Sequence, residues 1–163
     1  MRRDFAERYH ELVEEQIEGA DVRELVQDIF SVDPATGRRR YRRGLVGMPR
    51  KNGKSLLGAG IALYGLIADG EMGAEVYSCA GDKEQARIVF GDAKRMIQLN
   101  PELARWAEEK RLNVYRDAIE FPETGSVYRV LSAEAFTKEG LNPSLVIFDE
   151  VHVQPSDELW NVM

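Results

Sequence analysis

Apolar residues recur at helical spacing in several segments of the chain. In residues 2–17 they come three or four positions apart, which predicts an amphipathic helix. A second helix is expected from Asp21 through Phe30, with Glu24 three residues after Asp21 as in a capping box. Further helices are predicted at 54–68, 82–98 and 101–109, and a last one begins at Pro155.

Short runs rich in apolar residues alternate with these helices and predict strands. They cover 41–47, 74–80, 112–116, 118–121, 126–131 and 144–150. The last contains LVIF, a continuous apolar run typical of a strand covered on both faces. Strands that alternate with helices favour an α/β fold, here a three-layer sandwich with a mainly parallel sheet.

Composition and charge narrow the class of protein. The chain has 163 residues, a net charge of −6 and one cysteine, Cys79, so no internal disulfide can form. Cys79 is expected to be a small core residue, and its solitary state fits a reducing cytoplasm. No apolar run is long enough for a membrane span. An acidic chain binds nucleic acid poorly as a whole, and the one basic run, from Arg38 to Arg43, is expected at the surface.

Residues 47–55, GMPRKNGKS, join a predicted strand to a predicted helix, which is the context of a phosphate-binding loop. Gly53 permits a tight turn of inward-pointing N–H groups. Lys54 brings a positive charge to the β- and γ-phosphates, and Ser55 offers a hydroxyl to Mg²⁺. The pattern is imperfect, because Met48 stands where GxxxxGK[ST] has glycine. A surface turn with chance lysines is the alternative.

A pair of acids follows the strand predicted near the end of the chain. Asp149 could hold Mg²⁺, and Glu150 could orient or deprotonate a water molecule that attacks a phosphate. The alternative is a strand end followed by solvated acids. Both motifs lie at the carboxyl ends of predicted strands, where α/β sheets bind ligands. Together they predict a site for nucleotide hydrolysis.

Three segments resemble the large terminase subunit of tailed phages. They are PRKNGKS, SCAGDKEQA and GLNPSLVIFDEVH, and the resemblance runs from about Tyr41 to His152. An arginine inside the phosphate loop, as at Arg50, is typical of that family. The resemblance implies a P-loop ATPase fold that uses ATP and Mg²⁺. It also implies a ring of subunits in the cytoplasm of a bacterial host, with double-stranded DNA, portal protein and small terminase subunit as partners.

The resemblance also assigns roles to residues. Lys54 and Ser55 would hold phosphate and Mg²⁺, Asp149 would support the metal, and Glu150 would be the catalytic acid. Arg50 would touch the γ-phosphate. Lys51, Asn52 and Gly53 complete the expected nucleotide-binding set. Gln16 and Gln27 are candidates for an adenine contact, whereas Arg87 and Arg95 are more simply explained by a solvated helix face than by an arginine finger.

The family implies a longer protein. We expect a helical segment at 1–30 and a partial ATPase core at 31–163, with Walker A at 47–55, Walker B at 145–150 and no nuclease domain. In the family's fold, the strand that follows Asp149 and Glu150 lies between the loop strand and the acidic strand. The sheet should therefore be incomplete at the C-terminal end of this chain.

Two further functions remain open from the sequence. Asp-Glu-Val-His at 149–152 also spells a DExH helicase box, although helicase phosphate loops usually have more glycines than PRKNGKS. The chain could instead be a non-catalytic nucleotide-binding module, which would bind ATP without turnover.

Overall fold

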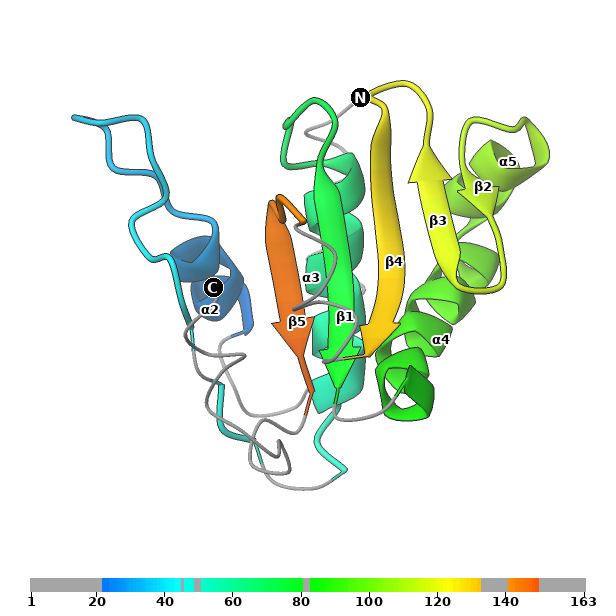
Figure 1. Cartoon of the computed structure of the whole chain (residues 1–163), viewed down its shortest axis with the longest axis horizontal. Helices are drawn as coiled ribbons and strands as arrows, with labels where there is room; N and C mark the ends of the chain where they lie inside the picture. The colour runs from blue at the N-terminus through cyan, green and yellow to red at the C-terminus, as the bar shows by residue number, and fades with distance from the viewer. Residues whose placement is uncertain (1–21, 45, 49–50, 81–82, 133–140, 150–163) are drawn as a thin grey trace.

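The computed structural model describes residues 22–44, 46–48, 51–80, 83–132 and 141–149. The helices and strands follow the predicted order closely (Figure 1). They are α2 (Val22–Ile29), α3 (Lys54–Ile67), β1 (Glu75–Ala80), α4 (Lys83–Leu99), α5 (Pro101–Glu108), β2 (Asn113–Val114), β3 (Ala118–Phe121), β4 (Ser126–Ser132) and β5 (Leu145–Phe148). The helices predicted at 2–17 and from Pro155 lie outside the described residues.

The five strands form one sheet in the order β2-β3-β4-β1-β5. β1 runs parallel to both of its neighbours, β4 and β5, whereas β3 is antiparallel to β2 and to β4. The tight turn between β3 and β4 ends at Gly125, whose φ of 70° favours glycine. The prediction of an α/β fold with a mainly parallel sheet is therefore confirmed.

The prediction of a strand at 41–47 is wrong. The described residues of this segment have no strand conformation, although Val46 and Met48 pack against the core. A strand forms only where a neighbouring strand takes up its backbone hydrogen bonds. In the described part of the chain, β5 pairs with β1 alone. Nothing in that part offers residues 41–47 the intervening strand that the family resemblance leads us to expect.

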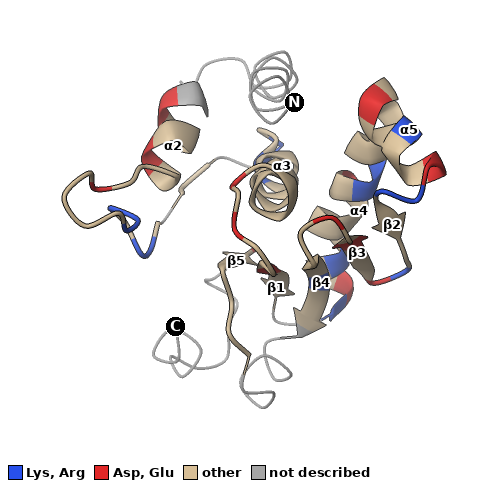
Figure 2. Ribbon diagram, turned by 90° about the horizontal axis from the view of Figure 1, so that it is seen from above, with Lys and Arg blue, Asp and Glu red and all other residues tan. Residues whose placement is uncertain are grey.

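The helices α3 and α4 pack on the same side of the sheet (Figure 2). The strands alternate between two faces: Val76, Ala80 and Ile147 join the core beneath the helices, whereas Tyr77 and Cys79 form a small cluster on the other face. Because the helices that cover the sheet among the described residues lie on one face, a third layer stays a prediction.

Two glycines let α3 lie close to β5. A Cβ added at Gly65 would lie 2.7 Å from Cδ2 of Leu145, and one added at Gly58 would lie 3.3 Å from Cγ2 of Ile147. Both contacts are tighter than side chains normally allow. These two glycines therefore permit close packing, and the N-terminal part of α3 is held beside the end of β5.

The segment around α2 attaches to α3 through aromatic packing. Val26 is buried in the main core, and the rings of Phe30 and Tyr64 lie 4.4 Å apart. Arg39 stacks over Phe30 and forms an ion pair with Asp69. The other arginines of the basic run are exposed, as expected, but they do not alternate along a strand.

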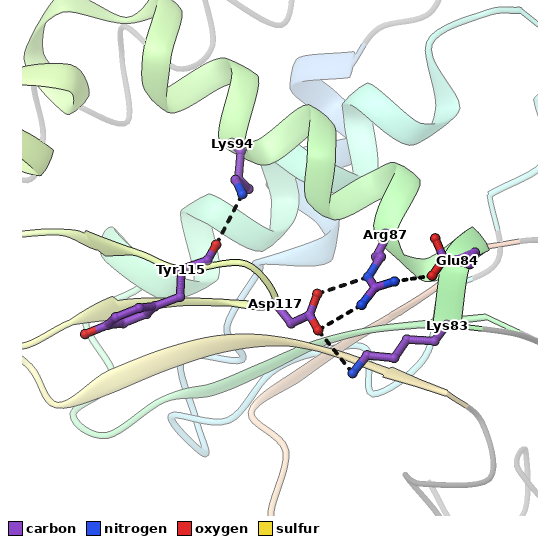
Figure 3. A network of polar contacts seen from close by, with 6 residues as sticks. All are labelled: Lys83, Glu84, Arg87, Lys94, Tyr115 and Asp117. Carbon is purple, nitrogen blue, oxygen red and sulfur yellow. Dashed lines mark hydrogen bonds and ion pairs between the residues drawn. The ribbon is translucent and has the colours of Figure 1, made fainter.

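A polar network ties α4 to the turn between β2 and β3 (Figure 3). Asp117 accepts two hydrogen bonds of 3.0 Å from the Arg87 guanidinium, and Lys83 lies 3.2 Å away. These contacts, those of Arg87 foremost, lower the pKa of Asp117 to about 2. The expectation that a solvated helix face explains Arg87 is wrong, because its guanidinium is engaged by a carboxylate from a distant part of the chain.

The role of Gly65 can be tested against a second helical glycine. We expect Gly65→Val to lower the free energy of unfolding by about 1–3 kcal/mol, because the new side chain collides with Leu145. Gly91→Ala in α4 should raise it by about 0.5–1 kcal/mol, because a Cβ at Gly91 meets nothing within 4 Å. Urea unfolding measures both. A valine tolerated at position 65 would contradict the close packing.

The Asp117 network predicts a pH-dependent contribution to stability. The folded-state pKa lies below the ordinary value, so the contribution is complete above about pH 4 and is lost as the pH falls toward about 2. Asp117→Asn should therefore be less stable than the parent at neutral pH, and the difference should shrink over that window. Urea unfolding at a series of pH values measures it, and a difference that stays constant would count against the network.

Candidate nucleotide site

The turn before α3 has two residues in the left-handed region of backbone conformation. Lys51 and Gly53 both have positive φ, 68° and 75°. Gly53 is the N-cap of α3 and forms no side-chain capping bond, and its carbonyl accepts the first helical hydrogen bond from Leu57 N at 2.8 Å. A left-handed lysine is uncommon, and the described residues include a second one, Lys110 in the exposed turn after α5, so the conformation of Lys51 is one that a surface turn also adopts.

The candidate residues occupy the places that the sequence predicts. Lys54 and Ser55 form the first turn of α3, and Lys51 and Asn52 are exposed just before it. Helix N-termini present unsatisfied N–H groups and a positive dipole end, both of which suit a phosphate. Pro49, Arg50 and Glu150 lie outside the described residues, so their roles stay predictions.

One ion pair joins the two motifs. Nζ of Lys54 lies 2.8 Å from Oδ1 of Asp149. The Asp149 side chain is only 11% exposed, and its backbone N–H donates to the carbonyl of Cys79 at the end of β1. Asp149 follows Ile147 by two positions, so its side chain points to the helix face of the sheet. The tertiary fold therefore brings the lysine of the loop and the first acid of the pair to one point.

The donor set suits Mg²⁺ better than other metals. A hydroxyl from Ser55 and a carboxylate from Asp149 are hard oxygen ligands, and Mg²⁺ typically takes one or two carboxylates together with phosphate oxygens and water. The described residues contain no cluster of three or more His, Cys, Asp or Glu that could hold a metal by themselves. A metal here would thus depend on oxygens from a bound phosphate.

The other residues that the sequence analysis considered for a functional role either have a different role in the structure or remain untested. Cys79 is buried and its pKa is raised to about 12 by desolvation, so it is a core residue and no nucleophile. Gln27 is exposed on α2, and Gln16 and His152 lie outside the described residues. Arg95 is exposed on α4.

None of the helices in the described part has the length and apolar character that a membrane span requires.

Sequence reasoning missed the partner of Arg87. Asp117 lies thirty positions away in the sequence, in a turn with no motif, and only the packing of α4 on the sheet brings the two together. It also missed the Lys54–Asp149 pair as a direct contact, although both residues were candidates. The periodicity of apolar residues predicts which helix or strand carries a side chain. Contacts between side chains of different elements depend on the order of the strands in the sheet, which periodicity does not give.

Comparisons with known proteins point to one family. The family model "Terminase large subunit, ATPase domain" matches residues 25–163. The chain is 37% identical over 107 residues to the terminase large subunit of Enterobacteria phage HK97, which covers 65% of this chain and 21% of that protein. It is 32% identical over 108 residues to the terminase large subunit of Lactococcus phage p2, covering 66% of this chain and 20% of that protein.

A solved structure agrees with these matches. The crystal structure of the HK97 bacteriophage large terminase aligns with a TM-score of 0.61 and 25% sequence identity, over 88% of this chain and 34% of that chain. The present chain thus spans about a fifth of the length of the curated relatives it matches.

The Lys54–Asp149 pair can be measured as a coupling energy. Lys54→Ala and Asp149→Ala should each destabilise the fold. The double variant should lose about 1 kcal/mol less than the sum, because each single change leaves the other charge without its partner. Urea unfolding of the four proteins gives the cycle. Strictly additive losses would mean that the two groups do not interact in solution.

Proposed function

Because this chain belongs to the terminase large-subunit ATPase family, we propose that it binds ATP at residues 47–55 and hydrolyses it as part of a DNA-packaging motor. The observation that carries this proposal is the 2.8 Å ion pair between Lys54 and Asp149. It joins a cationic loop at a helix N-terminus to a carboxylate at a strand end, and phosphoryl transfer needs both in one place.

The loop supplies the phosphate-binding part of the reaction. The N–H groups at the start of α3 donate to phosphate oxygens, and the Lys54 ammonium neutralises charge on the β- and γ-phosphates. When ATP binds, the Lys54 ammonium would exchange its contact with Asp149 for one with a neighbouring phosphate oxygen, so the side chain would need little reorganisation. Arg50, in the same loop, contacts the γ-phosphate in this proposal.

Ser55 and Asp149 would hold Mg²⁺. The ion, when bound, screens the phosphate charge and lowers the barrier to transfer. Asp149 is suited to this role because it is largely buried and its backbone is fixed by the bond to Cys79. Its carboxylate therefore keeps one position relative to the loop.

Glu150 is the residue that we propose activates the attacking water molecule. It accepts a hydrogen bond, and then a proton, from a water molecule whose oxygen attacks the γ-phosphorus. The bond from the γ-phosphorus to the bridging oxygen breaks, and ADP and phosphate are the products. Glu150 directly follows Asp149, the proposed metal ligand, in the sequence after β5.

The wider function follows from the family. In the complete protein, we infer that ATP hydrolysis drives double-stranded DNA into a procapsid, with a portal protein, a small terminase subunit and further copies of the large subunit as partners. The reaction would take place in the cytoplasm of the bacterial host. No observation on the described residues favours a DExH helicase.

The proposal is tested by MgATP binding and turnover with the purified chain. Lys54→Ala should weaken ATP binding by about a hundredfold or more, because a charge-assisted contact to phosphate is worth about 2–3 kcal/mol or more. Glu150→Ala should bind ATP as well as the parent and lose turnover. Asp149→Asn should remove the dependence of binding on Mg²⁺.

Arg38→Ala is the matched control, because Arg38 is an exposed cation away from the loop. MgATP binding that is unchanged in Lys54→Ala would disprove the site. Binding that needs Lys54 without any turnover would support the alternative of a non-catalytic nucleotide-binding module for this chain.

A further inference from the structure

The outer face of α4 carries a concentration of positive charge that the nucleotide site does not use. An open groove of about 530 Å³ runs along α4 and is lined by Arg87, Lys94, Arg95 and Arg116, with Glu84 as its one acid. The chain as a whole has a net charge of −6. A basic groove on an acidic protein concentrates positive potential at one place, which favours a negatively charged partner.

The walls of this α4 groove are held in place by contacts within the chain. Arg87 is fixed by Asp117 and Glu84, and Nζ of Lys94 donates to the carbonyl of Tyr115 at 3.2 Å (Figure 3). Arg95 and Arg116 are exposed and form no direct ion pair with any other described residue, and Arg95 interacts with the partly buried carboxylate of Asp92 on α4 only through a longer-range charge attraction. Two cations thus shape the groove, and two remain available at its rim.

Large apolar side chains stand exposed beside the same groove. Leu99 is 73% exposed and Ile88 is 55% exposed, both on α4, and Val114 and Tyr115 are exposed at the end of β2. Ile88, Arg95 and Leu99 are seven and four positions apart, so they share one face of the helix. Apolar side chains gathered next to arginines are typical of protein interfaces.

Gly91 is a second, independent observation. It lies in the groove, in the middle of α4, where glycine costs about 0.5–1 kcal/mol relative to alanine. Nothing in the described part of the chain requires a glycine there, because an added Cβ would meet no atom within 4 Å. Glycine at such a place is explained when another molecule approaches the helix backbone closely.

We propose that the α4 groove docks an acidic, partly apolar segment of another protein. Carboxylates of that segment would pair with Arg95 and Arg116, its apolar side chains would cover Ile88 and Leu99, and its backbone would pass over Gly91. Duplex DNA would match the cations but would leave the two aliphatic side chains without a function. The groove shares no residue with the nucleotide site, so the proposal does not depend on ATP hydrolysis.

The test uses the full chain and a short labelled helical peptide with glutamate on one face and leucine on the other. Fluorescence anisotropy should show binding that weakens with added salt. Arg95→Glu combined with Arg116→Glu should reduce affinity by about a hundredfold, since each lost pair is worth about tenfold. A peptide with lysine in place of glutamate should not bind.

A matched variant controls for net charge. Arg38→Glu combined with Arg40→Glu makes the same charge change on exposed residues elsewhere, and it should leave peptide affinity unchanged. Gly91→Ala should weaken peptide binding about tenfold while it stabilises the chain, so a loss of binding could not be attributed to unfolding. Circular dichroism verifies the fold of each variant.

Three results would overturn the proposal. The first is peptide binding that is absent or is reduced equally by the Arg38 and Arg40 control. The second is binding of a duplex DNA oligonucleotide in preference to the peptide, with loss of that binding in the Arg95 and Arg116 variant. The third is self-association of the parent chain that this variant abolishes, which would make the groove a contact between copies.

Discussion

The close packing of α3 on β5 is the constraint on which the candidate site depends. Gly58 and Gly65 remove the side chains that would separate helix and strand, and Leu145 and Ile147 fill the space. Lys54 begins α3, and Asp149 follows β5. The distance between the two charged groups is therefore set largely by the contact of Gly58 with Ile147, which lies close to both of them, and by the contact of Gly65 with Leu145 farther along both elements.

This arrangement explains why the loop can be strained and cationic. Its C-terminal side is the start of a helix anchored on the sheet, and on its N-terminal side Val46 and Met48 pack against the core without strand pairing. The positive φ of Lys51 and Gly53 is thus maintained between two fixed ends. Strain of this kind persists only where surrounding structure determines it, as at ligand-binding sites.

The charged side chains of the described residues form two regions that differ in where their cations face. At the carboxyl end of the sheet, Lys54 faces the largely buried carboxylate of Asp149, so its charge is directed inward. On α4, the ion pairs of Arg87 support a groove whose remaining cations face outward. The first region suits a small anion held at one point, and the second suits an extended partner.

The sequence by itself determined the order and type of nearly every described helix and strand. The spacing of apolar residues indicates which face of an element is buried, and turn residues mark where the element ends. The motif spacing in the sequence also predicts Lys54, Ser55 and Asp149 as site residues, since chemistry restricts which residues can bind phosphate and metal, and the structure brings Lys54 and Asp149 into contact. Tertiary structure decided the rest. Residues 41–47 have the composition of a strand, and yet the described residues of this segment form none, because strand formation requires a pairing neighbour. The contacts of Arg87 with Asp117 and of Gly65 with Leu145 depend on strand order and helix placement, which are long-range properties that no local pattern encodes.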